Sequence, residues 1–242
     1  MAGFSVGTLV QTKTGLRSIQ ELRVGDLVYT QSDNQEFCAT AIKKVIILEE
    51  QELWALTYFH PIPVDGIFNK EIVLATSDQL IWVSQYEDDI GETHKVDGWL
   101  RVDQLYQCEA KGLLHNQQVI GLTANPVLAT PNPSLGYIVE ELEWNPQYLC
   151  EITNTQTVLF GVKHLTGGLA LRYDVAKGRV PYNKERIKIA QLDDEPVIEF
   201  LAYYQNTRLM GYEHRFKACT YQLILEQGDS YFVQSQGIRV HQ

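Results

Sequence analysis

Cysteine and histidine are the residue types in this chain that could serve as nucleophiles, proton carriers or metal ligands. The four cysteines lie far apart in the sequence and form none of the closely spaced Cys/His pairs that bind zinc (Cys38, Cys108, Cys150 and Cys219). Most histidines are scattered in the same way (His60, His94, His115, His164 and His214). We therefore expect free, partly buried thiols, histidines in surface or packing roles, and neither a metal site nor a bound cofactor.

Local sequence argues against two further kinds of site. Gly167-Gly168 is not followed by the Lys-Ser/Thr pair of a phosphate-binding loop. The acidic runs at 87–89 and 193–195 are typical of solvated loops rather than metal sites. Trp82 and Trp99 are expected in the core rather than on a binding surface.

The overall composition narrows the classes of partner. The 242 residues include 20 Lys and Arg against 30 Asp and Glu, a net charge of −10, with 45% hydrophobic and 21% charged residues. This is ordinary usage for a folded domain. The acidic balance argues against nucleic acid, which requires clustered Lys and Arg, and against a membrane surface. We find no apolar run long enough to span a bilayer and no signal peptide.

Short β-like runs between turn residues must position any site. The 13 Tyr, 8 Phe and 4 Trp favour β-structure. One helical turn is predicted at 16–22, where apolar residues recur three apart. Strands are predicted at 4–11, 27–30, 41–48, 53–59, 71–75, 80–83, 220–225, 230–233 and 238–240. The fold class predicted is therefore all-β.

A weak internal repeat relates residues 15–22 to residues 98–105, at a constant offset of 83. Each copy begins with glycine and carries an apolar pair three residues apart, Ile19 and Leu22 in the first copy and Val102 and Leu105 in the second. A duplicated β unit would give this pattern. Chance would also give it, because turns followed by short helices are common.

The two ends of the chain carry ordered blocks of residues. The opening block runs Gly3-Phe4-Ser5-Val6-Gly7-Thr8 and continues with Gly15, Ile19, Leu22 and Gly25-Asp26. A second block contains Thr76-Ser77-Asp78-Gln79, and the closing blocks run from Tyr221 to Val240-His241-Gln242. In order and spacing these blocks resemble the Hint superfamily, the self-processing modules of inteins, hedgehog-type proteins and bacterial intein-like or pretoxin domains.

The resemblance implies the Hint horseshoe, an all-β unit with pseudo-two-fold symmetry, and a self-cleaving chemistry. In Hint domains the thiol of the first residue attacks the preceding carbonyl and shifts the peptide to a thioester. The Thr and His of a Thr-x-x-His block polarise and protonate the scissile amide. A penultimate His then assists a terminal Asn, whose amide closes onto its own carbonyl. The implied partner is the chain's own flanking polypeptide.

The sequence departs from this pattern at catalytic positions. Gly3 stands where the nucleophilic cysteine is expected and has no side chain to attack with. Gln79 replaces the histidine of the Thr-x-x-His block, and an amide cannot carry a proton near neutral pH. Gln242 replaces the terminal asparagine, so that cyclisation would need a slower six-membered imide. Asp229 lies where many members carry a histidine.

The resemblance carries over intact at Thr76, Asp78 and His241. Together with the four altered positions, these residues are the predicted site. Loss of the nucleophile alone is expected to stop the acyl shift at the Ala2–Gly3 bond. An engineered and a natural replacement at position 3 both fit the sequence.

Residues 122–213 differ in composition and pattern from the rest of the sequence, since they contain Pro-rich loops and an acidic stretch. We expect residues 1–121 and 214–242 to form the Hint-like autoprocessing domain, and 122–213 to be an inserted β/loop-rich segment of unknown role packed on it. Many inteins carry a homing endonuclease at this place, but its apolar-acidic motif is not found and the acidic balance opposes DNA binding.

Three functions are compatible with the sequence. The first is Hint-type self-processing, meaning splicing or autoproteolytic cleavage of flanking sequence, in a form that lacks the nucleophile and is inactive as given. The second is a non-catalytic Hint-derived scaffold or interaction module within a larger protein, which follows from the four altered positions. The third is an unrelated β enzyme or binder whose site lies in the insertion. Oligomeric state and compartment cannot be read from the residues.

Overall fold

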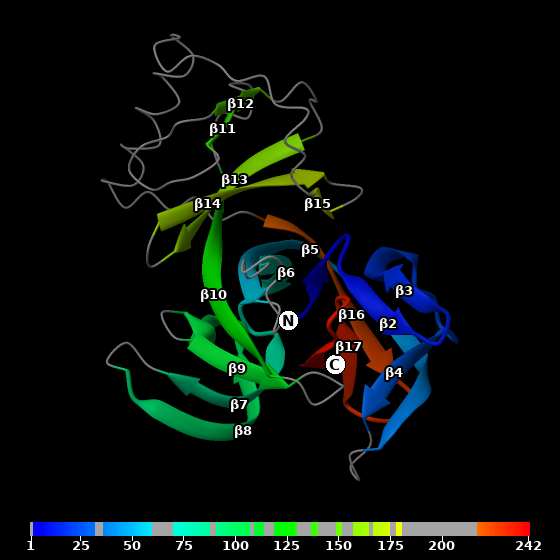
Figure 1. The fold of residues 1–242 in the computed structure, drawn as a ribbon. Coiled ribbons are helices and arrows are strands. Elements are labelled where there is room, and N and C mark those ends of the chain that lie inside the picture. Colours follow the sequence, from blue (N-terminus) through cyan, green and yellow to red (C-terminus); the bar gives the residue numbers. More distant parts are fainter. Residues whose placement is uncertain are drawn as a thin grey trace. The chain divides into compact units, whose positions relative to one another are not determined.

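Strands make up nearly all the regular structure of this protein (Figure 1). The computed structural model describes residues 2–31, 36–59, 70–87, 91–106, 109–113, 119–129, 137–139, 149–151, 157–164, 167–174, 178–180 and 217–242. In these residues the only helical elements are two 3₁₀ turns, so the predicted all-β fold is confirmed. No helix among them is long and apolar enough to cross a bilayer.

The chain divides into two compact units, one formed by Met1–Asn125 with Lys217–Gln242 and the other by Pro126–Phe216. The second unit pairs Val127–Ala129, the end of β10, with β13, and its described strands also form the antiparallel pairs β11–β12, β13–β14 and β14–β15. Its strands are β11 (Tyr137–Val139), β12 (Leu149–Glu151), β13 (Thr157–His164), β14 (Gly167–Asp174) and β15 (Gly178–Val180). Its assignment as an insertion into a Hint-like domain stays a prediction.

The first unit contains both ends of the chain. Its elements in the first half are β1 (Phe4–Ser5), β2 (Leu9–Thr12), β3 (Gly15–Ser18), η1 (Ile19–Glu21), β4 (Leu27–Gln31), β5 (Phe37–Phe59), β6 (Lys70–Thr76), β7 (Leu80–Glu87), β8 (Thr93–Arg101), η2 (Val102–Leu105), β9 (Glu109–Leu113) and β10 (Val119–Ala129). The closing strands are β16 (Lys217–Leu225), β17 (Ser230–Val233) and β18 (Ile238–His241). The N- and C-terminal strands lie together near the centre of this unit (Figure 1).

Strand β5 joins two strands that the sequence separates. The predicted break falls in the polar stretch at 49–52, yet the strand runs unbroken from Phe37 to Phe59. The reason is tertiary, because β16 pairs with the middle of β5 through this stretch, with Lys217 opposite Glu52. The register of this pairing shifts between Ala218 and Thr220, and Glu50 on β5 adopts a left-handed φ of 52° there.

The helical turn predicted at 16–22 is shorter than expected and of another type. Leu16 and Arg17 pair with Gln11 and Val10 in the β2–β3 hairpin, so they are extended. The helical part is a single 3₁₀ turn over Ile19–Glu21. Cross-strand pairing therefore overrides the three-residue spacing in the first half of that segment.

The repeat seen in the sequence is a repeat in the structure. In each copy a hairpin, β2–β3 or β7–β8, leads into a 3₁₀ turn. Its first amide donates to the residue ahead of the hairpin: Ile19 N to Thr8 O at 2.8 Å, and Val102 N to Gln79 O at 2.9 Å. The apolar pairs of both copies are fully buried.

The closing hairpin β17–β18 completes this symmetry. Val233 of β17 pairs with Val10 of β2, whereas Val240 of β18 pairs with Ile81 of β7. One hairpin thus binds the two copies through its two strands, which confirms the expected pseudo-two-fold architecture. Buried side chains from both ends of the chain join the same core, where the rings of Phe4 and Tyr231 meet edge to face at 6.4 Å.

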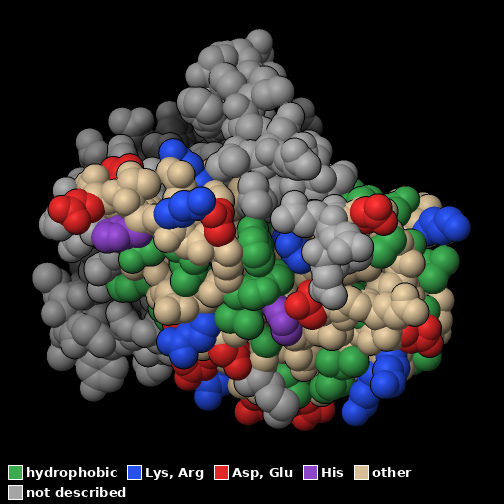
Figure 2. Space-filling view, turned by 90° about the horizontal axis from the view of Figure 1, so that it is seen from below, with side chains coloured by type: hydrophobic (Ala, Val, Ile, Leu, Met, Phe, Trp, Pro, Cys, Tyr) green, Lys and Arg blue, Asp and Glu red, His purple; other side chains and the backbone are tan. Residues whose placement is uncertain are grey.

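The described surface is mixed in charge. On the face seen in Figure 2, Lys and Arg side chains are dispersed among Asp and Glu instead of gathering in one patch. Cys38 and Cys219 are free and exposed, so these two thiols are not partly buried as expected. The predictions for the side chains of Cys108, Cys150, His60, His115, His164 and His214, for residues 88–89 and for the run at 193–195 concern parts of the chain outside the description.

Candidate functional site

Gly3 is held at the edge of β6 by its own backbone. Its N–H donates to the Thr76 hydroxyl oxygen at 3.0 Å, and its carbonyl accepts from the Thr76 N–H at 2.9 Å. Both residues are buried, with Thr76 only 3% exposed. The next residue, Phe4, continues as β1 between β6 and β16. The peptide bond ahead of Gly3 therefore meets the side chain of Thr76 with its amide fixed in place.

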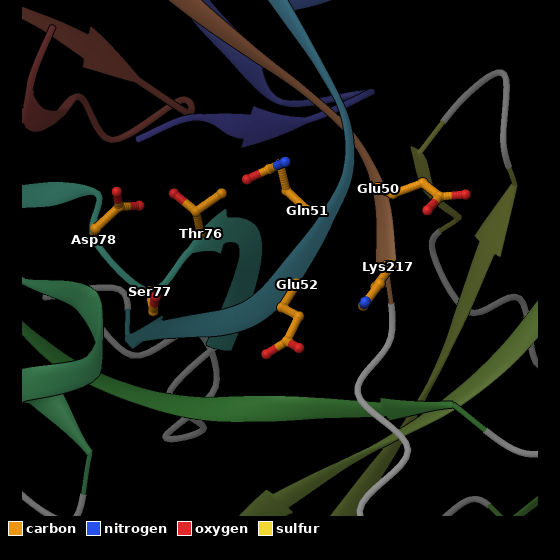
Figure 3. Close-up of a pocket in the computed structure, with 7 residues that line it drawn as sticks. All are labelled: Glu50, Gln51, Glu52, Thr76, Ser77, Asp78 and Lys217. Atoms are coloured by element: carbon orange, nitrogen blue, oxygen red, sulfur yellow. The ribbon is translucent and has the colours of Figure 1, made fainter. Parts of the chain in front are cut away.

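The Thr76 hydroxyl links this amide to a carboxylate. It accepts from Gly3 and bonds the side chain of Asp78, beside which it lies in Figure 3. Partial burial acts to raise the pKa of the Asp78 carboxyl. Hydrogen bonds from the amine that begins the chain and from Thr76, together with the charge of that amine, outweigh burial and lower the pKa below its ordinary value of 3.8. Asp78 is therefore ionised at neutral pH, and the Thr76 oxygen, with its proton turned to Asp78, is a better acceptor for the amide.

Gln79 ties the same turn to the other end of the chain. Its side-chain nitrogen donates to the carbonyl oxygen of His241 at 2.8 Å and to that of Leu80 at 3.2 Å. The side chain is 1% exposed. The Gln79 amide thus bonds β18 through His241 and the start of β7 through Leu80, so this side chain links the two strands.

The imidazole of His241 faces a carbonyl, a carboxylate and an aromatic ring. Its Nδ1 lies 2.9 Å from the carbonyl oxygen of Gln242, and its Nε2 lies 3.8 Å from Asp229 Oδ2. The ring meets Trp99 edge to face at 5.1 Å. An imidazole so placed can donate a hydrogen bond from Nδ1 to the Gln242 carbonyl, which polarises that carbonyl.

The side chain of Gln242 is fully engaged with the turn between β16 and β17. Its Oε1 accepts from the Leu225 N–H at 2.7 Å, and its Nε2 donates to the Gly228 carbonyl at 3.1 Å. Its main-chain N–H donates to the Asp229 carbonyl at 2.8 Å. Attack of this amide on its own carbonyl would first require both side-chain bonds to break.

The seven residues predicted from the sequence form two neighbouring clusters joined by one turn. Gly3, Thr76 and Asp78 make the first cluster. Gln79, Asp229, His241 and Gln242 make the second. Because Thr76 and Gln79 belong to the same four-residue turn, the two ends of the chain meet there.

Sequence reasoning missed several neighbours of this site. Arg239 places its guanidinium 4.8 Å from the Trp82 ring and 5.2 Å from the Trp99 ring, next to His241 on β18. Burial lowers the pKa of Arg239, and the charge of Asp229 opposes this. Both tryptophans are half-buried, so their assignment to the core is wrong in part. Alternation along β18 puts Arg239 and His241 on one face, a signal that could have been used.

A cavity of about 340 Å³ opens beside Thr76 (Figure 3). Three carboxylates and one amine are among its lining residues, which are Glu50, Gln51, Glu52, Thr76, Ser77, Asp78 and Lys217. In the part of the chain that is described, no three His, Cys, Asp or Glu residues lie close enough to hold a metal ion.

Comparison with known proteins gives neither a matching family model nor a matching curated protein. Solved structures that resemble this chain include the bacterial intein-like domain from Clostridium thermocellum, with 15% identity over 100% of this chain and 99% of that one, at a TM-score of 0.48. Another is a DnaB intein from Synechocystis sp. PCC 6803, with 9% identity over 100% and 98% of the two chains, at 0.45. The gp41-1 intein matches at 9% identity over 100% and 99%, at 0.41. These are domains of the kind that the sequence blocks resemble; identities this low say nothing of activity.

Proposed function

We propose that this chain is a Hint-type self-processing domain whose cleavage chemistry has been switched off by the residues at its two ends. The observation that carries the proposal is the turn at residues 76–79. Its first residue bonds the amide of Gly3, and its last bonds the carbonyl of His241, at opposite ends of the chain. Self-excision requires this arrangement, because both bonds to be broken must lie near one set of polarising groups.

The remaining residues support a division of labour. The Thr76 hydroxyl accepts a hydrogen bond from the Gly3 N–H, and Asp78 keeps the hydroxyl oxygen in place. A fixed acceptor of this kind polarises the peptide bond ahead of Gly3 or twists it. His241 holds its Nδ1 at the Gln242 carbonyl, where it can stabilise charge that develops on the oxygen during attack. These groups polarise the Gly3 amide and the Gln242 carbonyl, but position 3 lacks an attacking group and position 242 carries the longer amide of glutamine.

Three features support the inactive form. Gly3 offers no nucleophile, so the acyl shift has no first step. Gln79 cannot protonate a leaving amine, and its amide protons are bonded to backbone carbonyls. The Gln242 amide nitrogen is hydrogen-bonded to the carbonyl of Gly228.

The test is restoration of the missing groups. The chain carrying Gly3→Cys, Gln79→His and Gln242→Asn is placed between two soluble marker proteins, and the products are followed on a gel and by mass spectrometry. We expect cleavage at one or both junctions over hours, and an intact product from the unaltered chain. A matched control carries Gly3→Ala with the other two changes. It has the Cβ but no nucleophile, so only the C-terminal junction can break. Full-length product at all times in the triple variant would refute self-processing.

A second function, a non-catalytic scaffold, is favoured by one observation. Gln79 and Gln242 each use their side chains to fix backbone carbonyls and amides of distant segments, which is a structural use of these positions. Under this proposal the chain holds two flanking segments together without cutting them. The native gene distinguishes the two: codons for Gly3 and Gln242 support the scaffold, and codons for cysteine and asparagine count against it.

A further inference from the structure

Thr220 carries a buried hydroxyl with no hydrogen-bond partner in the described part of the chain. The residue is 0% exposed. Its backbone is fixed on both sides, since β16 pairs Thr220 with Ser5 of β1 and with Leu48 of β5. A buried hydroxyl without a partner is unfavourable, and such groups call for an explanation.

The missing side chain at position 3 would point to this hydroxyl. A Cβ at Gly3 would lie 3.0 Å from Thr220 Oγ1, 3.1 Å from the carbonyl oxygen of Tyr221 and 3.2 Å from Thr220 Cβ. The unpartnered hydroxyl and the missing side chain thus face the same small volume.

The strand cannot turn a side chain at position 3 in another direction. The Gly3 N–H and carbonyl are both bonded to Thr76, and Phe4 is paired with Tyr221 and Ala75. Residue 3 is therefore held between two threonines, Thr76 at its backbone and Thr220 at its side-chain position.

We propose that Thr220 is a positioning residue for the nucleophile at position 3: its hydroxyl donates a hydrogen bond to a small sulfur or oxygen there, and lacks a partner in this chain because the residue is glycine. The inference rests on the proposed self-processing function and extends it to a residue outside the seven predicted ones. A donor at this place favours the thiolate over the thiol and holds it toward the peptide bond ahead of position 3.

The same geometry limits the side chains that fit. At 3.0 to 3.2 Å the neighbours must yield by a few tenths of an ångström, even for an unbranched Cβ. The Thr220 hydroxyl can rotate away from Cβ toward an atom one bond farther out, but the Tyr221 carbonyl is part of the sheet. Cysteine and serine satisfy this limit, whereas a β-branched residue does not.

The test measures the acidity of a thiol at position 3 in the full-length chain. Gly3→Cys is combined with Thr220→Ser or with Thr220→Ala, a matched pair in which both lose the methyl group and only serine keeps the hydroxyl. Thiol pKa values are read from ¹³Cβ-labelled cysteine by NMR, which needs no access for a reagent. Cys219 is exposed on the neighbouring position and serves as an internal reference. Asp78, the titratable group bonded to Thr76, is the same in every variant.

We expect the acid dissociation constant of the position-3 thiol to be about tenfold smaller with alanine at 220 than with serine. The Cys219 signal should titrate alike in both. Equal constants for the position-3 thiol would overturn the inference. Because the readout needs no cleavage, the two proposals fail separately: a restored chain that cleaves with equal constants refutes Thr220, and one that never cleaves despite unequal constants refutes self-processing.

A second measurement covers the case in which the thiol variants do not fold. In the unaltered Gly3 chain, Thr220→Ala should have a urea midpoint at least as high as Thr220→Ser, because the hydroxyl has no bond to lose. A clearly lower midpoint for alanine would mean that the hydroxyl already has a partner, and the inference would be wrong.

Discussion

At the scale of single residues, Thr76 is the central group of the site. Its oxygen accepts the amide of Gly3, and its proton is turned toward Asp78. A threonine in an isolated strand would do neither, so its role comes from the two residues that the fold brings to it. The hydroxyl thus couples the backbone of position 3 to a negative charge.

The Asp78 carboxylate, which the amine that begins the chain and the Thr76 hydroxyl both stabilise, predicts a dependence of stability on pH. The folded-state pKa of Asp78 is lowered below its ordinary value of 3.8, so the ionised carboxyl stabilises the fold above that value. The contribution is lost as the pH falls through the lowered pKa. In urea unfolding from pH 7 down to about pH 2, Asp78→Asn should remove part of the fall in unfolding free energy below about pH 5.

Thr76→Val supplies the control for that experiment, since it removes the hydroxyl that bonds Asp78. Thr76→Val should reduce the fall in unfolding free energy at acid pH in part. Its change in unfolding free energy should not add fully to that of Asp78→Asn. Full additivity of the two changes would mean that Thr76 and Asp78 do not act together.

The sequence could supply much of the residue list, because spacing and block order point to Gly3, Thr76, Gln79 and His241. It could not supply Thr220. That residue belongs to a strand from the far end of the chain, and its place beside Gly3 depends on the register of β16 against β1. Register of this kind is set by tertiary pairing, which a single sequence does not display.

At the scale of elements, the repeated unit of hairpin and 3₁₀ turn is the building block of the first unit. The first copy carries Leu22 and the second Leu105, at 1% and 0% exposure. Leu22 directly follows its 3₁₀ turn and Leu105 is the last residue of its own, and the first amide of each turn is bonded to the residue ahead of its hairpin. Because the two leucines occupy equivalent positions in a two-fold arrangement, they should contribute similarly to the free energy of unfolding.

We expect Leu22→Ala and Leu105→Ala each to lower the free energy of unfolding by about 2–5 kcal/mol, measured by urea denaturation. The matched control is Leu16→Ala, because Leu16 lies on β3 and is 44% exposed. It should change the value by less than about 0.5 kcal/mol. A small effect at only one of the two buried leucines would contradict their equivalence.

Strand pattern was predictable where apolar and polar residues alternate, and not where tertiary pairing overrides composition. The acidic stretch in the middle of β5 looks like a break because its residues disfavour strands. Pairing with β16 keeps it extended, and Glu50 takes a conformation that no sequence pattern announces.

At the scale of the whole molecule, the chain leaves one compact unit after Asn125 and returns to it at Lys217. The first unit has its own core, to which Val10, Ile81 and Val240 contribute from three separate stretches of sequence. Its cohesion therefore does not depend on the chain being continuous through the second unit.

Replacement of residues 126–216 by a Gly/Ser linker of about 20 residues should leave the first unit folded, because the entropy of closing a loop changes slowly with its length. The measurement is the dispersion of amide signals by NMR together with a cooperative urea transition. A collapsed spectrum would show that the second unit is needed for the first to fold.

The four-residue turn bonds Gly3 at one end and His241 at the other, and this closeness of the two chain ends permits circular permutation. Two ends held so close can be joined by a few residues, and the chain can then be opened at an exposed bend such as Lys13-Thr14 between β2 and β3. Such a circular permutant would keep every strand pair described above except at the new ends. It would also place the bonds at Gly3 and Gln242 inside the chain, so that cleavage there would divide the permutant into two fragments that the strand pairs still hold together.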